Sequence, residues 1–223
     1  MPSTREAAAL TDRYRERVQT QRDAAGAAAA ASLAGLDLDL SRAAITAYLL
    51  QWAARSSTTV VNAQTATAAL TDAYLHGYLA ASLAPLLTVT AIDLAAHVGV
   101  TRDGTVDDLF RTAAKGLLWR LGRGAGRDAA LAYGQSLATR GAAVAVSDTA
   151  RDTLTDLMVA TPEVVGYRRV TASSTCERCA LAAERIYQKE VLLPRHPSCR
   201  CTQEPVLRTP ARFARPAPVV VRP

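Results

Sequence analysis

The residues of this sequence best suited to chemistry are four cysteines and one histidine near the C-terminus. Cys176 and Cys179 form a CxxC pair, and sixteen residues separate Cys179 from the stretch HPSCRC, which contains His196, Cys199 and Cys201. Structural zinc takes four sulfur or nitrogen ligands at tetrahedral corners, and two short ligand pairs joined by a loop supply them. Because every cysteine of the chain lies here, the pattern predicts a structural zinc site. Cys176, Cys179 and Cys199 are the firmest ligands, and His196 and Cys201 compete for the fourth position.

Other chemistry is compatible with parts of this pattern. Four cysteines can form two disulfides, but the sequence shows no secretory signal, so we expect a reducing compartment. A thioredoxin-type redox pair needs a βαβ context, which the sequence before Cys176 does not predict. Nucleobase deaminases combine H-x-E with P-C-x-x-C, whereas His76 and His97 are followed at that offset by Tyr78 and Gly99. Redox-active or disulfide-bonded cysteines and a catalytic metal remain as alternatives to structural zinc.

The rest of the sequence offers no catalytic constellation. It contains no nucleophile elbow, no marked pair of carboxylates and no Walker-type phosphate loop. The glycines at 122–127 follow no predicted strand and precede no Gly-Lys-Ser/Thr, so we interpret them as a hinge between helices. His76 and His97 are interpreted as ordinary packing or surface residues, because we expect neither to have a nearby acid or cysteine at ligand spacing. We therefore expect no catalytic residues and no enzyme activity.

Charge is concentrated in the C-terminal part of the chain. Eleven basic and four acidic residues lie between positions 168 and 222, so this segment carries +7. The whole chain carries +6, and the part before residue 166 therefore sums to −1. Four thiolates around one Zn²⁺ would return about two negative charges to the C-terminal part. The positive field is thus expected around the cysteines and the tail.

The segments that must position these cysteines are predicted to be mostly helical. Hydrophobic residues make up 49% of the chain but aromatic ones only 5%, which is typical of closely packed helices rich in Ala, Leu and Val. No window reaches the roughly 18 uninterrupted apolar residues of a membrane span, so we expect a soluble protein or part of an assembly. Caps and apolar periodicity predict helices at about 5–33, from Ser41 through Trp52, at 58–83, a short one from about 91, then 105–121, 128–146 and 147–159.

The character of the sequence changes after Pro162. Alternation over 167–172 predicts a strand, and 180–183, 184–188 and 200–206 predict a helical turn and two short strands. So small a sheet buries little apolar surface, which favours a metal staple. The sequence thus predicts a mainly α protein with a helical body, a small zinc-stapled α+β module and a flexible C-terminal arm. The expected boundaries are 1–162 for the helical assembly domain, 166–207 for the module and 208–223 for the basic Pro-rich tail.

Three stretches of this module together resemble one known family. They are Gly166-Tyr167-Arg168-Arg169-Val170, the CxxC pair, and His196-Pro197-x-Cys199-Arg200-Cys201-Thr202 followed by Glu204-Pro205-Val206. Their order and type are similar to those of the phage Mu F-like minor head proteins, a head-morphogenesis or minor capsid family that includes an actinophage type. The similarity covers residues 166–206. Before that range the chain resembles the family only in being helical and Ala-rich.

The resemblance implies a minor capsid protein of a tailed bacteriophage that acts at the portal vertex in head assembly and in DNA packaging, retention or ejection. Its implied partners are the portal protein and other head proteins, with DNA as a further partner through phosphate contacts and with no membrane. Its implied location is the head interior of the virion, after assembly in the host cytoplasm. The family's metal-binding positions fall on Cys176, Cys179, His196, Cys199 and Cys201.

The charge distribution places any DNA contact in the C-terminal part. The residues expected to contact phosphates are Arg168, Arg169, Arg208, Arg212 and Arg215. The same arginines could instead pair with acidic surfaces of the portal. The alternative function is a soluble zinc-knuckle DNA-binding regulatory protein, although no helix-turn-helix or classical zinc-finger spacing supports it.

Overall fold

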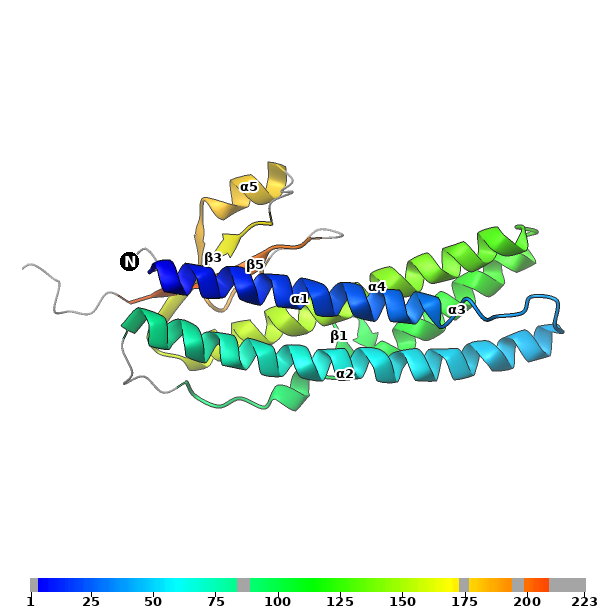
Figure 1. Ribbon diagram of the computed structural model, residues 1–223, viewed down its shortest axis with the longest axis horizontal. Helices are drawn as coiled ribbons and strands as arrows, with labels where there is room; N and C mark the ends of the chain where they lie inside the picture. The colour runs from blue at the N-terminus through cyan, green and yellow to red at the C-terminus, as the bar shows by residue number, and fades with distance from the viewer. Residues whose placement is uncertain (1–3, 84–88, 173–176, 194–198, 209–223) are drawn as a thin grey trace, which may run out of the picture.

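The computed structural model describes residues 4–83, 89–172, 177–193 and 199–208, which form a helical bundle carrying a small sheet (Figure 1). The helices are α1 (Arg5–Ala31), α2 (Arg42–Leu83), α3 (Val106–Gly122), α4 (Arg127–Ala160) and α5 (Glu177–Ala183), with a 3-10 helix η1 (Leu94–His97). The strands are β1 (Val100–Thr101), β2 (Gly104–Thr105), β3 (Val164–Val170), β4 (Ile186–Tyr187) and β5 (Thr202–Leu207). A mainly helical chain with a small sheet region is thus confirmed.

Several helix starts lie where the capping residues predict them. Ser41 Oγ accepts a hydrogen bond from the backbone N–H of Ala44 at 3.3 Å, which caps the start of α2. Thr105 and Asp108 form a complete capping box at the start of α3. The predicted hinge after α3 is also present, with Gly124 at a left-handed φ of 78° that favours glycine.

Two predicted helix breaks are wrong. The helices expected to begin at 58 and 147 are continuous with the preceding ones, so that α2 spans 42 residues and α4 spans 34. The hydroxyl of Ser147 donates to the carbonyl of Ala143 at 2.7 Å, and that of Thr58 donates to the carbonyl of Ala54 at 3.2 Å. Hydroxyls bonded four residues back lie inside a helix and leave no N-cap.

The bundle has two buried clusters, one toward each end. In the first, α1, α2, α3 and α4 pack around Trp52, whose ring meets that of Phe110 edge to face at 5.5 Å. In the second, residues of α1, α2 and α4 pack with Val164 and Tyr167 of β3 and with Leu193. The sheet therefore shares its buried side chains with one end of the bundle.

The sheet has the order β4-β3-β5, and both pairings are antiparallel. Tyr167 lies opposite Tyr187, and their rings stack at 5.2 Å. A Cβ at Gly166 would lie 2.4 Å from the carbonyl oxygen of Tyr187, so only glycine allows β4 to approach β3 this closely. This close pairing brings α5, which lies between β3 and β4 in the sequence, next to the sheet (Figure 1).

None of the helices in the described part of the chain combines the length and the apolar character that a membrane span requires. The expected C-terminal arm lies outside the described residues from position 209 onward.

Candidate metal centre

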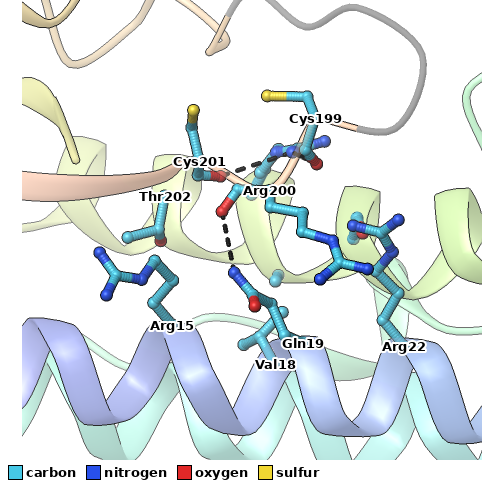
Figure 2. A pocket seen from close by; sticks show the side chains of 11 residues that line it. Arg15, Val18, Gln19, Arg22, Cys199, Arg200, Cys201 and Thr202 are labelled. Carbon is cyan, nitrogen blue, oxygen red and sulfur yellow. Dashed lines mark hydrogen bonds between the residues drawn. The ribbon is translucent and has the colours of Figure 1, made fainter. Parts of the chain in front are cut away.

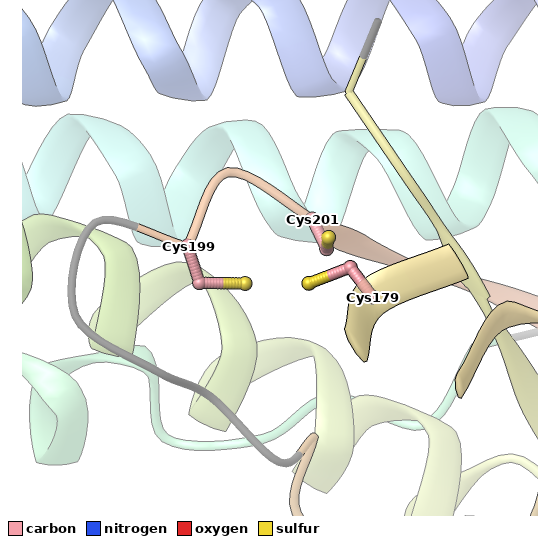
Figure 3. A group of neighbouring side chains, drawn as sticks. All are labelled: Cys179, Cys199 and Cys201. Carbon is pink, nitrogen blue, oxygen red and sulfur yellow. The ribbon is translucent and has the colours of Figure 1, made fainter. Parts of the chain in front are cut away.

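Three of the predicted ligands meet in the structure. Cys179 lies in α5, and Cys199 and Cys201 immediately precede β5. Their three sulfur atoms lie within 4.8 Å of one another, and all three residues are buried (Figure 3). We call these residues the cysteine cluster. The other two predicted ligands, Cys176 and His196, lie outside the described residues.

Both helical and extended segments position these sulfurs. Cys199 and Cys201 are two residues apart, which in an extended chain directs both side chains to the same side. The guanidinium of Arg151 in α4 donates to the carbonyl oxygens of Cys199 and Cys201 at 3.0 and 3.4 Å. The side-chain amide of Gln19 in α1 donates to the carbonyl oxygen of Arg200 at 3.2 Å (Figure 2). Two long helices therefore hold the backbone that carries two of the three cysteines.

A buried arginine lies directly against the sulfurs. Arg169 of β3 is 5% exposed, and its Nη1 lies 3.3 Å from Cys179 Sγ and 3.9 Å from Cys199 Sγ. Burial alone would lower the pKa of Arg169, but the negative charge of Cys201, Cys199 and Cys179 outweighs it, and the pKa is raised. The guanidinium is thus a fixed positive charge beside the cysteine cluster.

The thiols themselves are strongly coupled. The Cys201 side chain donates a hydrogen bond to Cys199 and lowers the pKa of Cys199 against the effect of burial, and Arg151 and Arg169 lower it further. The pKa of Cys201 is raised, because this residue keeps the shared proton and is buried. One thiolate is therefore favoured at neutral pH, and thiolate is the form that binds metal.

The cavity beside the cysteine cluster is very small. It has a volume of about 20 Å³ and is lined by Arg15, Arg22, Arg151 and Arg200 together with the backbone around Cys199 and Cys201 (Figure 2). This volume is close to that needed by a single water molecule. A substrate-sized ligand does not fit there, and the concentration of arginines suits a group with net negative charge.

The arginines predicted to contact DNA have different surroundings. Arg169 is buried against the sulfurs, so its guanidinium faces the cysteines and not the solvent. Arg168 pairs with Glu204 across the sheet at 2.6 Å. The backbone N–H of Arg208 donates to the carbonyl of Glu163 at 2.8 Å. Arg212 and Arg215 lie outside the described residues, and DNA binding by any of these arginines stays a prediction.

The two histidines in the helical part lie away from the cysteine cluster. His76 Nε2 lies 3.7 Å from a carboxylate oxygen of Asp72, and His97 Nε2 lies 3.3 Å from one of Asp156. Asp72 is four residues before His76 on the same helix, so the expectation that no acid lies near His76 is wrong. Among the described residues, the cysteine cluster is the only group of side chains arranged to hold a metal ion.

Sequence reasoning missed three residues that support the site. Arg169 was expected to contact DNA phosphates, but its burial could have been predicted. The two-residue period of the strand places it on the same face as the buried Tyr167. Gln19 and Arg151 reach their partners across separations of 181 and 48 residues. No local pattern in a single sequence marks them.

Comparisons with protein-family profiles, with curated proteins and with solved structures found no match to this chain, so the site must be interpreted from its own geometry.

Proposed function

We propose that this protein is a structural protein of a tailed-bacteriophage head, of the minor capsid type, whose C-terminal module is stapled by zinc. The observation that carries the proposal is the convergence of Cys179, Cys199 and Cys201 in the module whose motif resembles the Mu F-like minor head proteins. The cavity beside these residues has a volume of about 20 Å³, which is room for about one water molecule. A structural role for the metal therefore fits better than a catalytic one.

The distances suit zinc bound by thiolates. A tetrahedral zinc with Zn–S bonds of about 2.3 Å places its sulfur ligands about 3.8 Å apart. The three sulfurs already lie within 4.8 Å of one another, so a bound ion requires only a small closure. When bound, zinc would neutralise part of the thiolate charge and crosslink α5 to the segment before β5.

The surrounding charges fit a thiolate-rich ligand set. Zinc with four thiolates carries about −2, and with three thiolates and a histidine about −1. Arg169 at the sulfurs and Arg151 at the carbonyls would offset this charge in a buried setting. We propose Cys176 as the fourth ligand, because it is three residues from Cys179 and a CxxC pair binds from one turn. His196 is the alternative fourth ligand.

The assembly role would belong to the helical bundle. Its long helices offer an extended surface for contacts with the portal protein and other head proteins, and the zinc staple would keep the module folded at one end. In this proposal the protein is present in the head interior and has no enzymatic function.

Metal analysis tests the zinc site. Protein purified under reducing conditions is expected to contain about one zinc per chain. Cys179→Ser and Cys199→Ser should each lose most of it, whereas the matched variant His97→Gln should keep it. Freshly reduced protein without zinc, or a disulfide among these cysteines in the native protein, would contradict the site.

The assembly role needs a separate test. The gene should be expressed together with the portal and capsid genes of the same genome, and the particles purified by sedimentation. We expect the protein to cosediment with procapsids only when the portal is present. Sedimentation that is independent of the portal would contradict a role at the portal vertex.

A further inference from the structure

The bundle end farthest from the cysteine cluster carries a second concentration of positive charge. Between residues 109 and 140 the chain has six basic residues and one acidic residue, Asp128. The basic residues are Arg111, Lys115, Arg120, Arg123, Arg127 and Arg140, and all of them are exposed. Arg120, Arg123 and Arg127 lie where α3 and α4 are joined, and the other three lie further along these two helices. This junction is at the opposite end of the bundle from the sheet (Figure 1).

Two of these cations form a stack with aromatic rings. The guanidinium carbon of Arg120 lies 4.5 Å from the ring centre of Tyr133 in α4 and 5.9 Å from that of Trp119. The guanidinium carbon of Arg123 lies 5.3 Å from the ring centre of Trp119. We call Lys115, Trp119, Arg120, Arg123 and Tyr133 the basic tip.

The cations of the basic tip are available to an external anion. Arg111 pairs with Asp107, and Arg127 pairs with Asp39. Within the described part of the chain, Lys115, Arg120 and Arg123 have no such carboxylate partner. A guanidinium that stacks on a ring through its face keeps its N–H groups directed outward at its edge.

The chemistry of the basic tip suits phosphates better than a protein surface. A planar guanidinium edge matches two phosphate oxygens, which is why arginine is favoured over lysine where phosphates are recognised. Protein interfaces usually have an apolar centre. Between residues 106 and 140, however, Trp119 is the only large hydrophobic side chain that is exposed, and arginines lie over its ring.

We propose that the basic tip binds the phosphate backbone of duplex DNA without reading its sequence. The interaction would be electrostatic, since the tip offers cations to phosphates. Its residue in α4, Tyr133, lies about 27 Å along the helix from Arg151, and the interaction would not depend on metal. This location differs from the C-terminal arginines that the charge count alone singled out.

Binding of the full chain to a short duplex of mixed sequence tests the proposal, with fluorescence anisotropy measured over a series of salt concentrations. In Arg120→Gln/Arg123→Gln we expect the affinity at low salt to fall about tenfold. The slope of log K against log salt should fall by about 2, since each lost phosphate contact removes about 0.9.

The matched variant Arg13→Gln/Arg17→Gln removes two exposed arginines from α1 and should bind like the unaltered protein. In Arg120→Lys/Arg123→Lys the salt slope should persist with weaker affinity.

Three outcomes would overturn the proposal. The first is no binding of duplex by the intact protein at low salt. The second is an equal loss of affinity for duplex DNA in the tip variant and in its α1 control. A complete loss of this affinity in Arg212→Gln/Arg215→Gln, with no loss in the tip variant, would count equally. The third is binding of polyglutamate without binding of duplex, which would assign the tip to an acidic protein partner. Zinc content measured on the same samples is independent of all three, so failure of the metal site would be seen separately.

Discussion

At the scale of single residues, the contact between Arg169 and two cysteine sulfurs decides how the candidate metal centre balances its charge. A buried guanidinium needs a negative partner, and thiolates need a positive one when no water reaches them. Arg169 and the cysteine cluster satisfy both needs at 3.3 and 3.9 Å. This arrangement favours a metal complex with net negative charge over a neutral one.

Replacing Arg169 by glutamine should therefore weaken the binding of zinc. Residues just outside the ligands of a metal typically change its affinity about 10- to 100-fold, and we expect a loss in this range for Arg169→Gln. The measurement is competition for zinc with a chromophoric chelator. The neighbouring Arg168 pairs with Glu204 at 2.6 Å, so Arg168→Gln should keep the affinity of the unaltered protein. Equal weakening in both variants would contradict the role of Arg169 as the partner of the thiolates.

The cysteines could be predicted from sequence because ligand type and spacing are local properties. The spacing also gave Cys201 as a ligand candidate, and its sulfur does lie with those of Cys179 and Cys199. The residues that hold this backbone could not be predicted, because Gln19 and Arg151 approach it through the tertiary fold.

At the scale of elements, the pairing of β4 with β3 depends on the absence of a side chain at Gly166. The backbone carbonyl of Tyr187 occupies the space that a Cβ would need, at 2.4 Å. Backbone atoms cannot move aside as a flexible side chain can. The short strand β4 and the preceding α5, which carries Cys179, therefore depend on this one position.

Gly166→Ala should lower the free energy of unfolding by about 1–3 kcal/mol, the usual cost of inserting atoms into a packed region. It should also reduce the zinc content, because Cys179 would be displaced along with α5. Chemical denaturation and metal analysis measure the two effects. A Cβ at Gly122 meets no atom within 4 Å, so Gly122→Ala should change stability by less than about 0.5 kcal/mol. Unchanged stability and zinc content in Gly166→Ala would contradict this account.

The lengths of the helices show where sequence patterns are ambiguous. Serine and threonine favour N-caps, yet their hydroxyls also bond to carbonyls four residues earlier within a helix. Thr105 caps the start of α3, whereas the hydroxyl of Ser147 bonds to a carbonyl inside α4. Whether α4 continues through Ser147 depends on its packing against α1 and α3, and the sequence around Ser147 does not show this packing.

At the scale of the whole molecule, the cysteine module is joined to the bundle by packing and by hydrogen bonds. Tyr167 and Leu193 lie in a buried cluster with helical residues. Arg15 of α1 donates to the carbonyl of Thr171 at 2.9 Å, and Gln203 of β5 donates to Thr155 of α4 at 3.1 Å. The other buried cluster, around Trp52, contains residues of α1 to α4 and of the α1–α2 connection (Leu33 and Leu36), and it contains no residue of the cysteine module.

Removal of zinc by a chelator should therefore lower the melting temperature by about 10 °C while leaving the far-UV helical signal at 25 °C nearly unchanged. The first result follows because the module stabilises one end of the bundle, and the second because the cluster around Trp52 does not involve the module. Circular dichroism with and without chelator measures both. Cooperative loss of the helical signal at 25 °C would show that the bundle cannot stay folded without the metal.

The charge of the whole molecule also explains why the basic tip was not found from sequence. The part before residue 166 sums to −1, but the +5 between residues 109 and 140 is cancelled in this sum by acidic residues elsewhere. Only the fold shows that the junction of α3 and α4, near which Arg120 and Arg123 lie, is at the opposite end of the bundle from the sheet (Figure 1).

The hydrogen bond from Gln19 to the carbonyl of Arg200 has a consequence for the order in which the protein folds. It joins residues 181 positions apart, so the first helix and the segment before the last strand must meet before it forms. Contacts of such large separation are slow to form, because the entropy of a long loop is lost first. Helical hairpins such as α3 with α4 need only local contacts and should form early. We therefore expect the docking of the segment before β5 onto α1 to be a late step in folding.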